Sequence, residues 1–130
     1  MPERSADWLK QSSADLRHAG HALDDEDYEW AAFAAHQAAE KAIKALFQKR
    51  HLDAWGHTLS VLLASLPESD RPDQALIDAA KALDKHYIPT RYPNGFDRGA
   101  PTDFYTRDEA ERAIAQAETI CDFCRRQVDR

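Results

Sequence analysis

The sequence predicts an all-α fold, an antiparallel bundle of about five helices that forms one domain over residues 1–130. Apolar residues recur at spacings of three and four along several segments, which is the period of an amphipathic helix. No segment alternates apolar and polar residues in the way that a half-buried strand does. The connections between most helical segments are short, which favours antiparallel neighbours.

The first helix is expected over about residues 5–24, where Leu9, Leu16 and Leu23 are spaced by seven and form a narrow seam for an antiparallel neighbour. A short acidic turn, Asp24 to Asp27, follows it. A purely structural role, as a capped turn into the next helix, is favoured over a cation site, because the turn lacks the ligand spacing of a calcium loop.

The segment from Trp30 to Arg50 is expected to be the central helix, because it lacks Gly and Pro and is rich in strong helix formers. Asp25 and Asp27 precede it and can cap its N-terminus. One face consists of small residues that let other helices approach closely: Ala32, Ala35, Ala39, Ala42 and Leu46. The opposite side carries a mainly polar stripe, so several neighbours are expected to cover the rest of the helix: Phe33, Gln37, Glu40, Lys41, Lys44 and Gln48.

Three further helices are expected after this one. A short helix over about residues 58–66 is capped by His57 or Thr58 and ended by Pro67. The fourth begins near residue 70 or 72 and stops before residue 89. The last begins at the capping box Thr106-Arg-Asp-Glu109, the clearest start signal in the chain.

The segment from residue 88 to 105 is irregular, and long loops of this kind tend to be functional or disordered. Its aromatic residues favour partial docking on the helices. Arg91 follows a helix end and lies between two prolines, and a guanidinium is suited to gripping phosphate while a ring such as Tyr92 can stack on a base. The structural alternative is that Arg91 ties the loop to helix carbonyls or to Glu40.

The net charge of −6 comes entirely from residues 1–84, which hold 9 Lys/Arg and 15 Asp/Glu, while the remainder of the chain is balanced. This distribution disfavours loose binding to duplex DNA or acidic membranes, so any nucleotide site must be local. No apolar run reaches membrane-spanning length and no secretory signal is visible, so the expected compartment is the cytoplasm.

The sequence contains only weak indications of a metal site or of a catalytic nucleophile. Cys121 and Cys124 form a C-x-x-C pair late in an amphipathic helix, and they are expected to be reduced cysteines near the core. No metal site and no Ser-His-Asp or Cys-His arrangement is suggested by spacing. His57 stands out among the six histidines because it lies at a helix start beside Gly56, although a capping or packing role is the simpler interpretation.

The run from Ala35 to Ala45, AHQAAEKAIKA, resembles the signature of the HEPN domain (higher eukaryotes and prokaryotes nucleotide-binding). The sequence His57-Thr-Leu, Tyr87 and Arg91-Tyr92-Pro93 also fit, and the resemblance covers nearly the whole chain. It implies a bundle of about five helices that forms a homodimer or higher homo-oligomer. It also implies partnership with a minimal nucleotidyltransferase in a two-component, toxin–antitoxin-like system.

Some HEPN proteins are ribonuclease toxins whose signature is Arg, four to six residues, then His, near the start of a late helix. Here Arg91, Arg98 and Arg107 have no His after them, and the one match with six intervening residues, Arg50 to His57, is interpreted as chance. The resemblance therefore implies a non-catalytic protein without a cofactor or metal, which binds ATP, another nucleotide or RNA, or a nucleotidyltransferase.

The expected binding residues follow from the loop after the fourth helix and the polar stripe of the central helix: Arg91, Tyr92, Lys44, Lys41, Tyr105 and His57. No catalytic residue is assigned. Two alternatives stay open. One is a metal-independent HEPN ribonuclease with diverged catalytic residues, and the other is a purely structural dimeric helical adaptor.

Overall fold

The computed structural model describes residues 2–130, and over these residues it contains α-helices, 3-10 turns and no strand. The α-helices are α1 (Ser5–Asp24), α2 (Tyr28–Lys49), α3 (Leu59–Ala64), α4 (Gln74–Asp84), α5 (Pro101–Phe104) and α6 (Arg107–Val128). The 3-10 turns are η1 (Glu68–Asp70) and η2 (Pro93–Gly95). The predicted all-α bundle is confirmed, and the one-turn helix α5 inside the long loop is an addition to the five expected helices.

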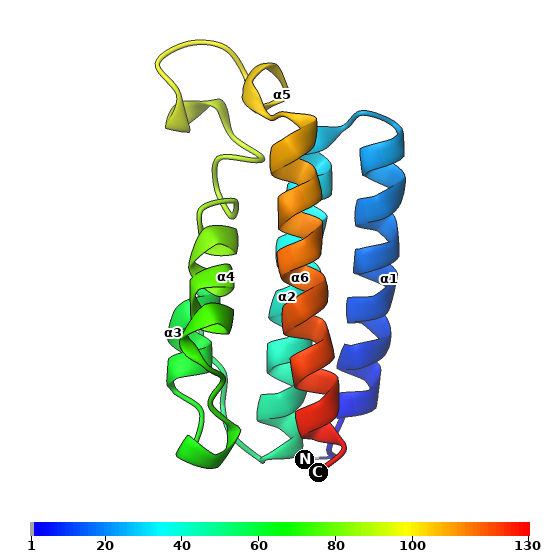
Figure 1. Cartoon of the computed structure of the whole chain (residues 1–130), viewed down its shortest axis with the longest axis vertical. Helices are drawn as coiled ribbons and strands as arrows, with labels where there is room; N and C mark the ends of the chain where they lie inside the picture. Colours follow the sequence, from blue (N-terminus) through cyan, green and yellow to red (C-terminus); the bar gives the residue numbers. More distant parts are fainter. Residues whose placement is uncertain (1) are drawn as a thin grey trace.

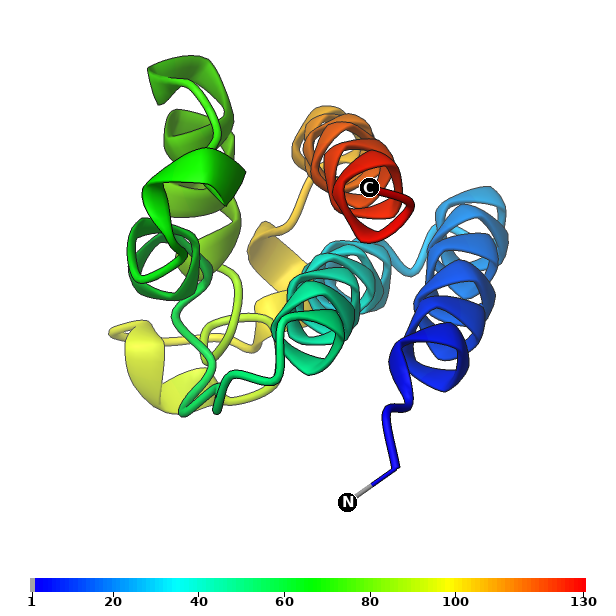
Figure 2. The ribbon, with the colours of Figure 1, turned by 90° about the horizontal axis from the view of Figure 1, so that it is seen from below.

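Helix α2 lies at the centre of the bundle, in contact with α1 on one side and α6 on another, while α3 and α4 pack as a pair against the remaining side (Figures 1 and 2). This placement follows from its alanines, which are buried and allow close helix approach: Ala31, Ala32, Ala34, Ala35, Ala38, Ala39, Ala42 and Ala45. The two chain ends lie at the same end of the bundle (Figure 1).

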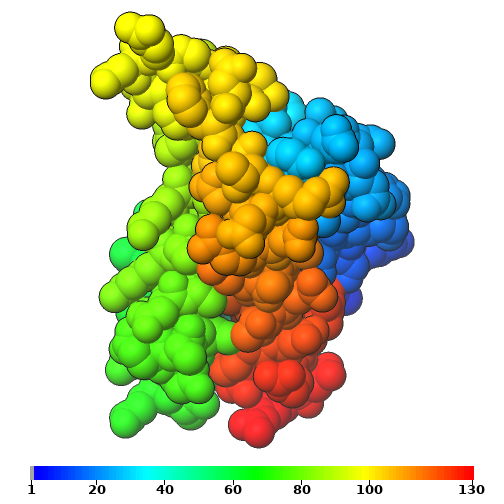
Figure 3. Space-filling view, turned by 45° about the horizontal axis from the view of Figure 1, so that its top comes forward, coloured from blue at the N-terminus to red at the C-terminus, as the bar shows by residue number. Residues whose placement is uncertain are grey.

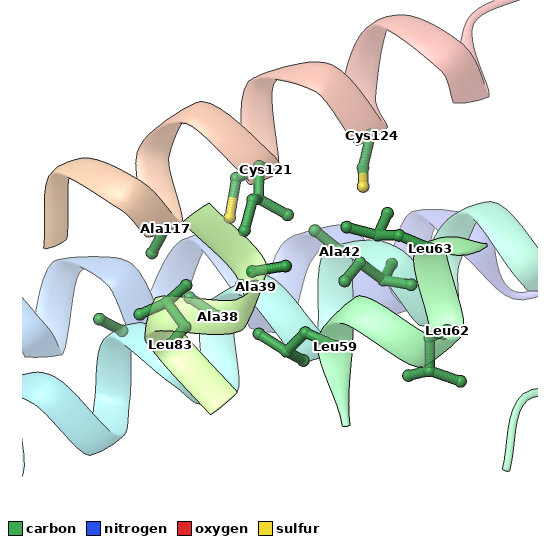
Figure 4. Close-up of a cluster of buried hydrophobic side chains, with 14 of the residues drawn as sticks. Ala38, Ala39, Ala42, Leu59, Leu62, Leu63, Leu83, Ala117, Cys121 and Cys124 are labelled. Carbon is green, nitrogen blue, oxygen red and sulfur yellow. The ribbon is translucent and has the colours of Figure 1, made fainter. Parts of the chain in front are cut away.

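The main core lies between α2, α3, α4 and α6. Leu59 and Leu63 from α3 and Leu83 from α4 are fully buried there. Cys121 and Cys124 point from α6 into the same cluster (Figure 4). Both are free thiols, as expected, and burial raises the pKa of each. They therefore act as small apolar core residues.

The helix caps differ in part from expectation. Asp27 is the N-cap residue of α2 and Thr58 that of α3, but neither side chain makes a capping hydrogen bond. Helix α3 is instead capped from α4, because the carboxylate of Asp84 accepts from the amide of Leu59 at 2.6 Å and from the amide of Ser60 at 3.3 Å. The capping box at Thr106 and Glu109 is present as predicted.

The segment between α4 and α6 is folded and projects at one end of the bundle (Figure 3). Phe96 stacks on Phe104, with ring centroids 4.7 Å apart, which closes the loop on itself. Thr90 is buried and its hydroxyl donates to the His86 carbonyl at 2.6 Å. The start of the loop is therefore fixed at the end of α4, and this fixes the position of Arg91.

Candidate functional site: an arginine over an aromatic cluster

The guanidinium of Arg91 lies over three aromatic rings contributed by two parts of the chain. Its Cζ is 4.4 Å from the ring centroid of Phe33 on α2, 4.5 Å from that of Tyr87 and 5.1 Å from that of Tyr92. Rings at these distances stabilise a cation through their electron-rich faces without neutralising its charge. Arg91 is therefore held in place while it remains a cation.

One nitrogen of Arg91 is used by the fold. Its Nε donates to the carbonyl oxygen of Tyr87 at 2.9 Å. This is a structural tie of the kind expected, but its partner lies in the turn after α4 and is neither a helix carbonyl nor Glu40. Over residues 2–130 no carboxylate lies within 4.0 Å of this guanidinium. The terminal nitrogens can therefore bind an added anion.

His57 lies against the same cluster. Its imidazole stacks on Tyr87, with ring centroids 4.7 Å apart and planes at 17°. Its Nδ1 is 2.9 Å from Oε1 of Glu40, and the other oxygen of that carboxylate accepts from Lys44 at 3.1 Å. Glu40 is nearly fully buried, whereas half of the His57 side chain is exposed. A carboxylate at Nδ1 holds the proton there and leaves Nε2 as the acceptor.

A buried histidine on α2, His36, contacts the backbone of His57. His36 on α2 is fully buried, and its Nε2 lies 3.2 Å from the carbonyl oxygen of His57. The Gln37 amide nitrogen lies 3.2 Å from the other ring nitrogen, so the neutral ring both donates and accepts. Burial lowers the pKa of His36, which keeps the ring neutral.

Four of the six predicted binding residues lie at or next to the aromatic cluster, and two lie elsewhere. Arg91, Tyr92 and His57 meet around Tyr87, and Lys44 joins them through Glu40. Lys41 forms an ion pair with Asp15 of α1 on a neighbouring part of α2.

Tyr105 lies apart from this group, half-buried, with its hydroxyl 2.8 Å from Nδ1 of His86. Burial raises its pKa to about 12. Its ring packs on that of His86, so its main contacts serve the fold.

Arg50 and His57, the one pair with the spacing of the ribonuclease signature, have different partners. Arg50 donates to both oxygens of Asp70, at 2.8 and 3.0 Å, and to the backbone oxygen of Gln127 at 2.7 Å. Asp70 is buried, and this guanidinium lowers its pKa. Arg50 therefore serves as a structural tie between α2, η1 and α6.

Sequence reasoning did not identify Phe33 and Tyr87 as supports of Arg91. It named Glu40 as an alternative partner of Arg91, whereas Glu40 is bonded to His57 and Lys44. Phe33 and Glu40 belong to the polar stripe of α2, where one aromatic residue and one carboxylate interrupt a run of amides and lysines. Their spacing of seven residues places them on one face, and this was the available signal. Their contact with residues after α3 and α4 depends on tertiary packing.

Comparison with known proteins supports the same fold. The sequence matches the HEPN domain over residues 5–127. The chain belongs to the HEPN family. Among solved structures it resembles TT1696 from Thermus thermophilus, with 48% identity, a TM-score of 0.94, and coverage of 97% of this chain and 99% of that one.

Two other HEPN structures are similar over nearly their full length. ST0689, an archaeal HEPN homologue, is 37% identical, with a TM-score of 0.81 and coverage of 98% of this chain and 99% of the other. The HEPN domain protein TM0613 from Thermotoga maritima is 36% identical, with a TM-score of 0.78 and coverage of 95% and 98%.

A more distant relative is MJ1304 of Methanocaldococcus jannaschii, whose name assigns it provisionally as a toxin. It is 23% identical over 122 residues, which cover 87% of this chain and 80% of that protein. Over residues 2–130 of the present HEPN chain, no helix has the length and apolar character needed to cross a membrane.

Proposed function

We propose that this HEPN protein is a non-catalytic nucleotide-binding protein whose anion site is the guanidinium of Arg91. The observation that carries the proposal is the combination of three rings around Arg91 with no carboxylate partner in residues 2–130. A planar guanidinium with unused terminal nitrogens matches the geometry of phosphate oxygens. Aromatic groups beside it offer stacking surfaces for the rest of a nucleotide.

The other predicted binding residues are expected to contribute to nucleotide binding to different extents. His57 stacks on the same Tyr87 ring as Arg91, and its Nε2 can accept a hydrogen bond from a ligand hydroxyl. Tyr92, which is half exposed, is the stacking ring nearest to solvent. Lys44 and Lys41 are each paired with a carboxylate, so they contribute less to an anion site than Arg91 does.

The test is nitrogen-15 NMR of the full chain titrated with ATP, following the Nε–H signals of its arginines. The proposal predicts that the Arg91 signal shifts with saturation, while that of Arg107, which lies over Tyr28 at 5.3 Å on the surface of α6, does not. Arg107 is a matched control because it also stacks on a tyrosine. An unmoved Arg91 signal at millimolar ATP would contradict the proposal.

A second candidate function, a metal-independent ribonuclease with diverged residues, is favoured by the pair His57–Glu40. A carboxylate that orients a half-exposed imidazole through Nδ1 is a general-base arrangement, and Arg91, which contacts the same Tyr87 ring, could hold a phosphodiester. This candidate predicts cleavage of structured RNA in the presence of EDTA, abolished in His57→Ala. Intact RNA after hours with the wild-type protein would remove it.

The proposed assembly is a homo-oligomer that acts with a minimal nucleotidyltransferase in a two-component, toxin–antitoxin-like system in the cytoplasm. The indole of Trp55, which is 83% exposed, supports a protein contact, because tryptophan is enriched at the energetic centres of interfaces. Sedimentation and co-purification with the product of a neighbouring nucleotidyltransferase gene test the assembly. A monomer at micromolar concentration that captures no such protein would contradict it.

A further inference from the structure

A hollow of about 290 Å³ opens between α1 and α2, next to the Arg91 cluster. Residues from both helices line it, among them Asp15, Trp30, Phe33, Ala34, Gln37 and Lys41. Phe33 belongs to the hollow and also lies under the guanidinium of Arg91. The hollow and the anion site therefore adjoin across a single aromatic ring.

Two rings form a corner of this hollow. Trp30 and Phe33 meet edge to face, with centroids 6.1 Å apart and planes at 77°. Trp30 is 49% exposed, a large amount for an indole that has α1 beside it. A flat heteroaromatic group can lie on one of these rings while its edge meets the other, which is a favourable geometry for aromatic pairs.

The polar groups of the hollow include both hydrogen-bond donors and hydrogen-bond acceptors. Asp15 and Lys41 form an ion pair across the two helices, with side chains that are 16% and 25% exposed. The amide nitrogen of Gln37 contacts His36, which leaves the amide oxygen as the acceptor that this side chain offers. A nucleobase carries donors and acceptors on its edge and a π-face on each side, so its chemistry matches this lining.

We propose that this hollow binds the base of the nucleotide whose phosphate contacts Arg91. The inference rests on the proposed nucleotide-binding function and assigns the base to α1 and α2, with Trp30 as the main stacking ring and Gln37 and the Asp15–Lys41 pair at the base edge. Trp30 then takes the base-stacking role given above to Tyr92, and Tyr92 borders the phosphate and sugar.

The test compares AMP with ribose 5-phosphate, which carries the same sugar and phosphate without the base. Calorimetric titrations are made on the wild-type protein, on Trp30→Ala and on Val61→Ala. Val61 is the control, an apolar side chain of α3 that is 59% exposed and lies outside this hollow. AMP is expected to bind the wild type roughly tenfold or more tighter than ribose 5-phosphate, since stacking of one base contributes about that factor.

Trp30→Ala is expected to remove most of this advantage while leaving the affinity for ribose 5-phosphate unchanged. Val61→Ala is expected to change neither the advantage nor that affinity. Equal affinities of the two ligands for the wild type, or an equal loss for both ligands in Trp30→Ala, would overturn the base site and leave the Arg91 phosphate site standing. Absence of binding by both ligands would overturn the proposed function and the base site together. Unchanged melting temperatures of the variants confirm that each one folds.

Discussion

The imidazole Nδ1 of His57 lies 2.9 Å from a carboxylate oxygen of Glu40, which α2 holds almost completely out of solvent. The same carboxylate accepts from Lys44 at 3.1 Å. Glu40 thus connects the segment before α3 to the polar stripe of α2, and it lies between Lys44 and His57. This relationship fixes His57 against Tyr87, the ring that Arg91 also contacts.

Replacement of Glu40 by Gln is expected to lower the free energy of unfolding by about 1–3 kcal/mol, because it weakens hydrogen bonds from a lysine that is only 16% exposed. Urea unfolding of the two proteins measures the difference. Glu111→Gln, at an exposed position of α6, is the control and should shift the midpoint little. Equal effects of the two substitutions would contradict the role given to Glu40.

Replacement of Asp84 by Ala removes the only side chain that caps α3 in residues 2–130, and two amides at the helix start lose their acceptor. A lost cap typically costs about 1–2 kcal/mol of stability. Asp78→Ala serves as the control, because Asp78 accepts one exposed hydrogen bond from Gln74 on the same helix. Thermal melts that rank Asp78→Ala as the more damaging change would contradict this account of α3.

The sequence was sufficient to predict the helical bundle and to identify α2 as its central helix. The alanine face of α2 and the capping box at Thr106 are local patterns, and both are present as predicted. The caps of α2 and α3 were less predictable, because Asp84 reaches α3 from another helix, whereas the caps expected from local residues form no side-chain bond.

At the candidate site, Arg91 and His57 could be predicted because the family signature contains them. The residues that hold them in place could not, because those contacts depend on tertiary packing. The contact of Phe33 with Arg91 joins residues far apart in the chain, and no spacing within one helix reports it. The same holds for Arg50 and Asp70, whose buried pairing shows that Arg50 has a structural partner.

Stability is expected to decrease as the pH falls below about 6.5, because burial lowers the pKa of His36 and of His86 in the folded protein. The unfolded chain then binds protons that the folded chain does not, so the loss begins near the unfolded pKa and continues down to the folded pKa values. Urea midpoints between pH 7.5 and 5 measure it.

His86→Gln removes one of the two groups and should give a shallower decrease over this range. His18→Gln, at an exposed position of α1, should leave the decrease unchanged. A wild-type midpoint that is constant from pH 7.5 to 5 would contradict the burial of neutral imidazoles.

A second pH effect is expected at lower pH from Asp70. The Arg50 guanidinium lowers the pKa of this carboxyl below its ordinary value of 3.8, so the stabilisation is present above that value and is lost as the pH falls through the folded pKa. Asp70→Asn should cost roughly 3 kcal/mol at pH 7, since it leaves Arg50 without its charge partner.

The difference between Asp70→Asn and the wild type should shrink as the pH falls below about 4, because the unfolded wild type then binds a proton that the folded ion pair excludes down to its lower pKa. Chemical unfolding at pH 7 and pH 3 provides the comparison. A difference that is the same at both values would mean that the charge of Asp70 does not stabilise the fold.

The central claim is that Arg91 binds the phosphate of a nucleotide, and calorimetric titration of the purified protein with ATP tests it most directly. The wild type should give saturating heat, and Arg91→Ala should lose about 1.5–3 kcal/mol of binding free energy, the usual contribution of a hydrogen bond to a charged group. Arg107→Ala, which removes another arginine stacked on a tyrosine, should bind like the wild type. Equal affinities of the wild type and Arg91→Ala would contradict the account.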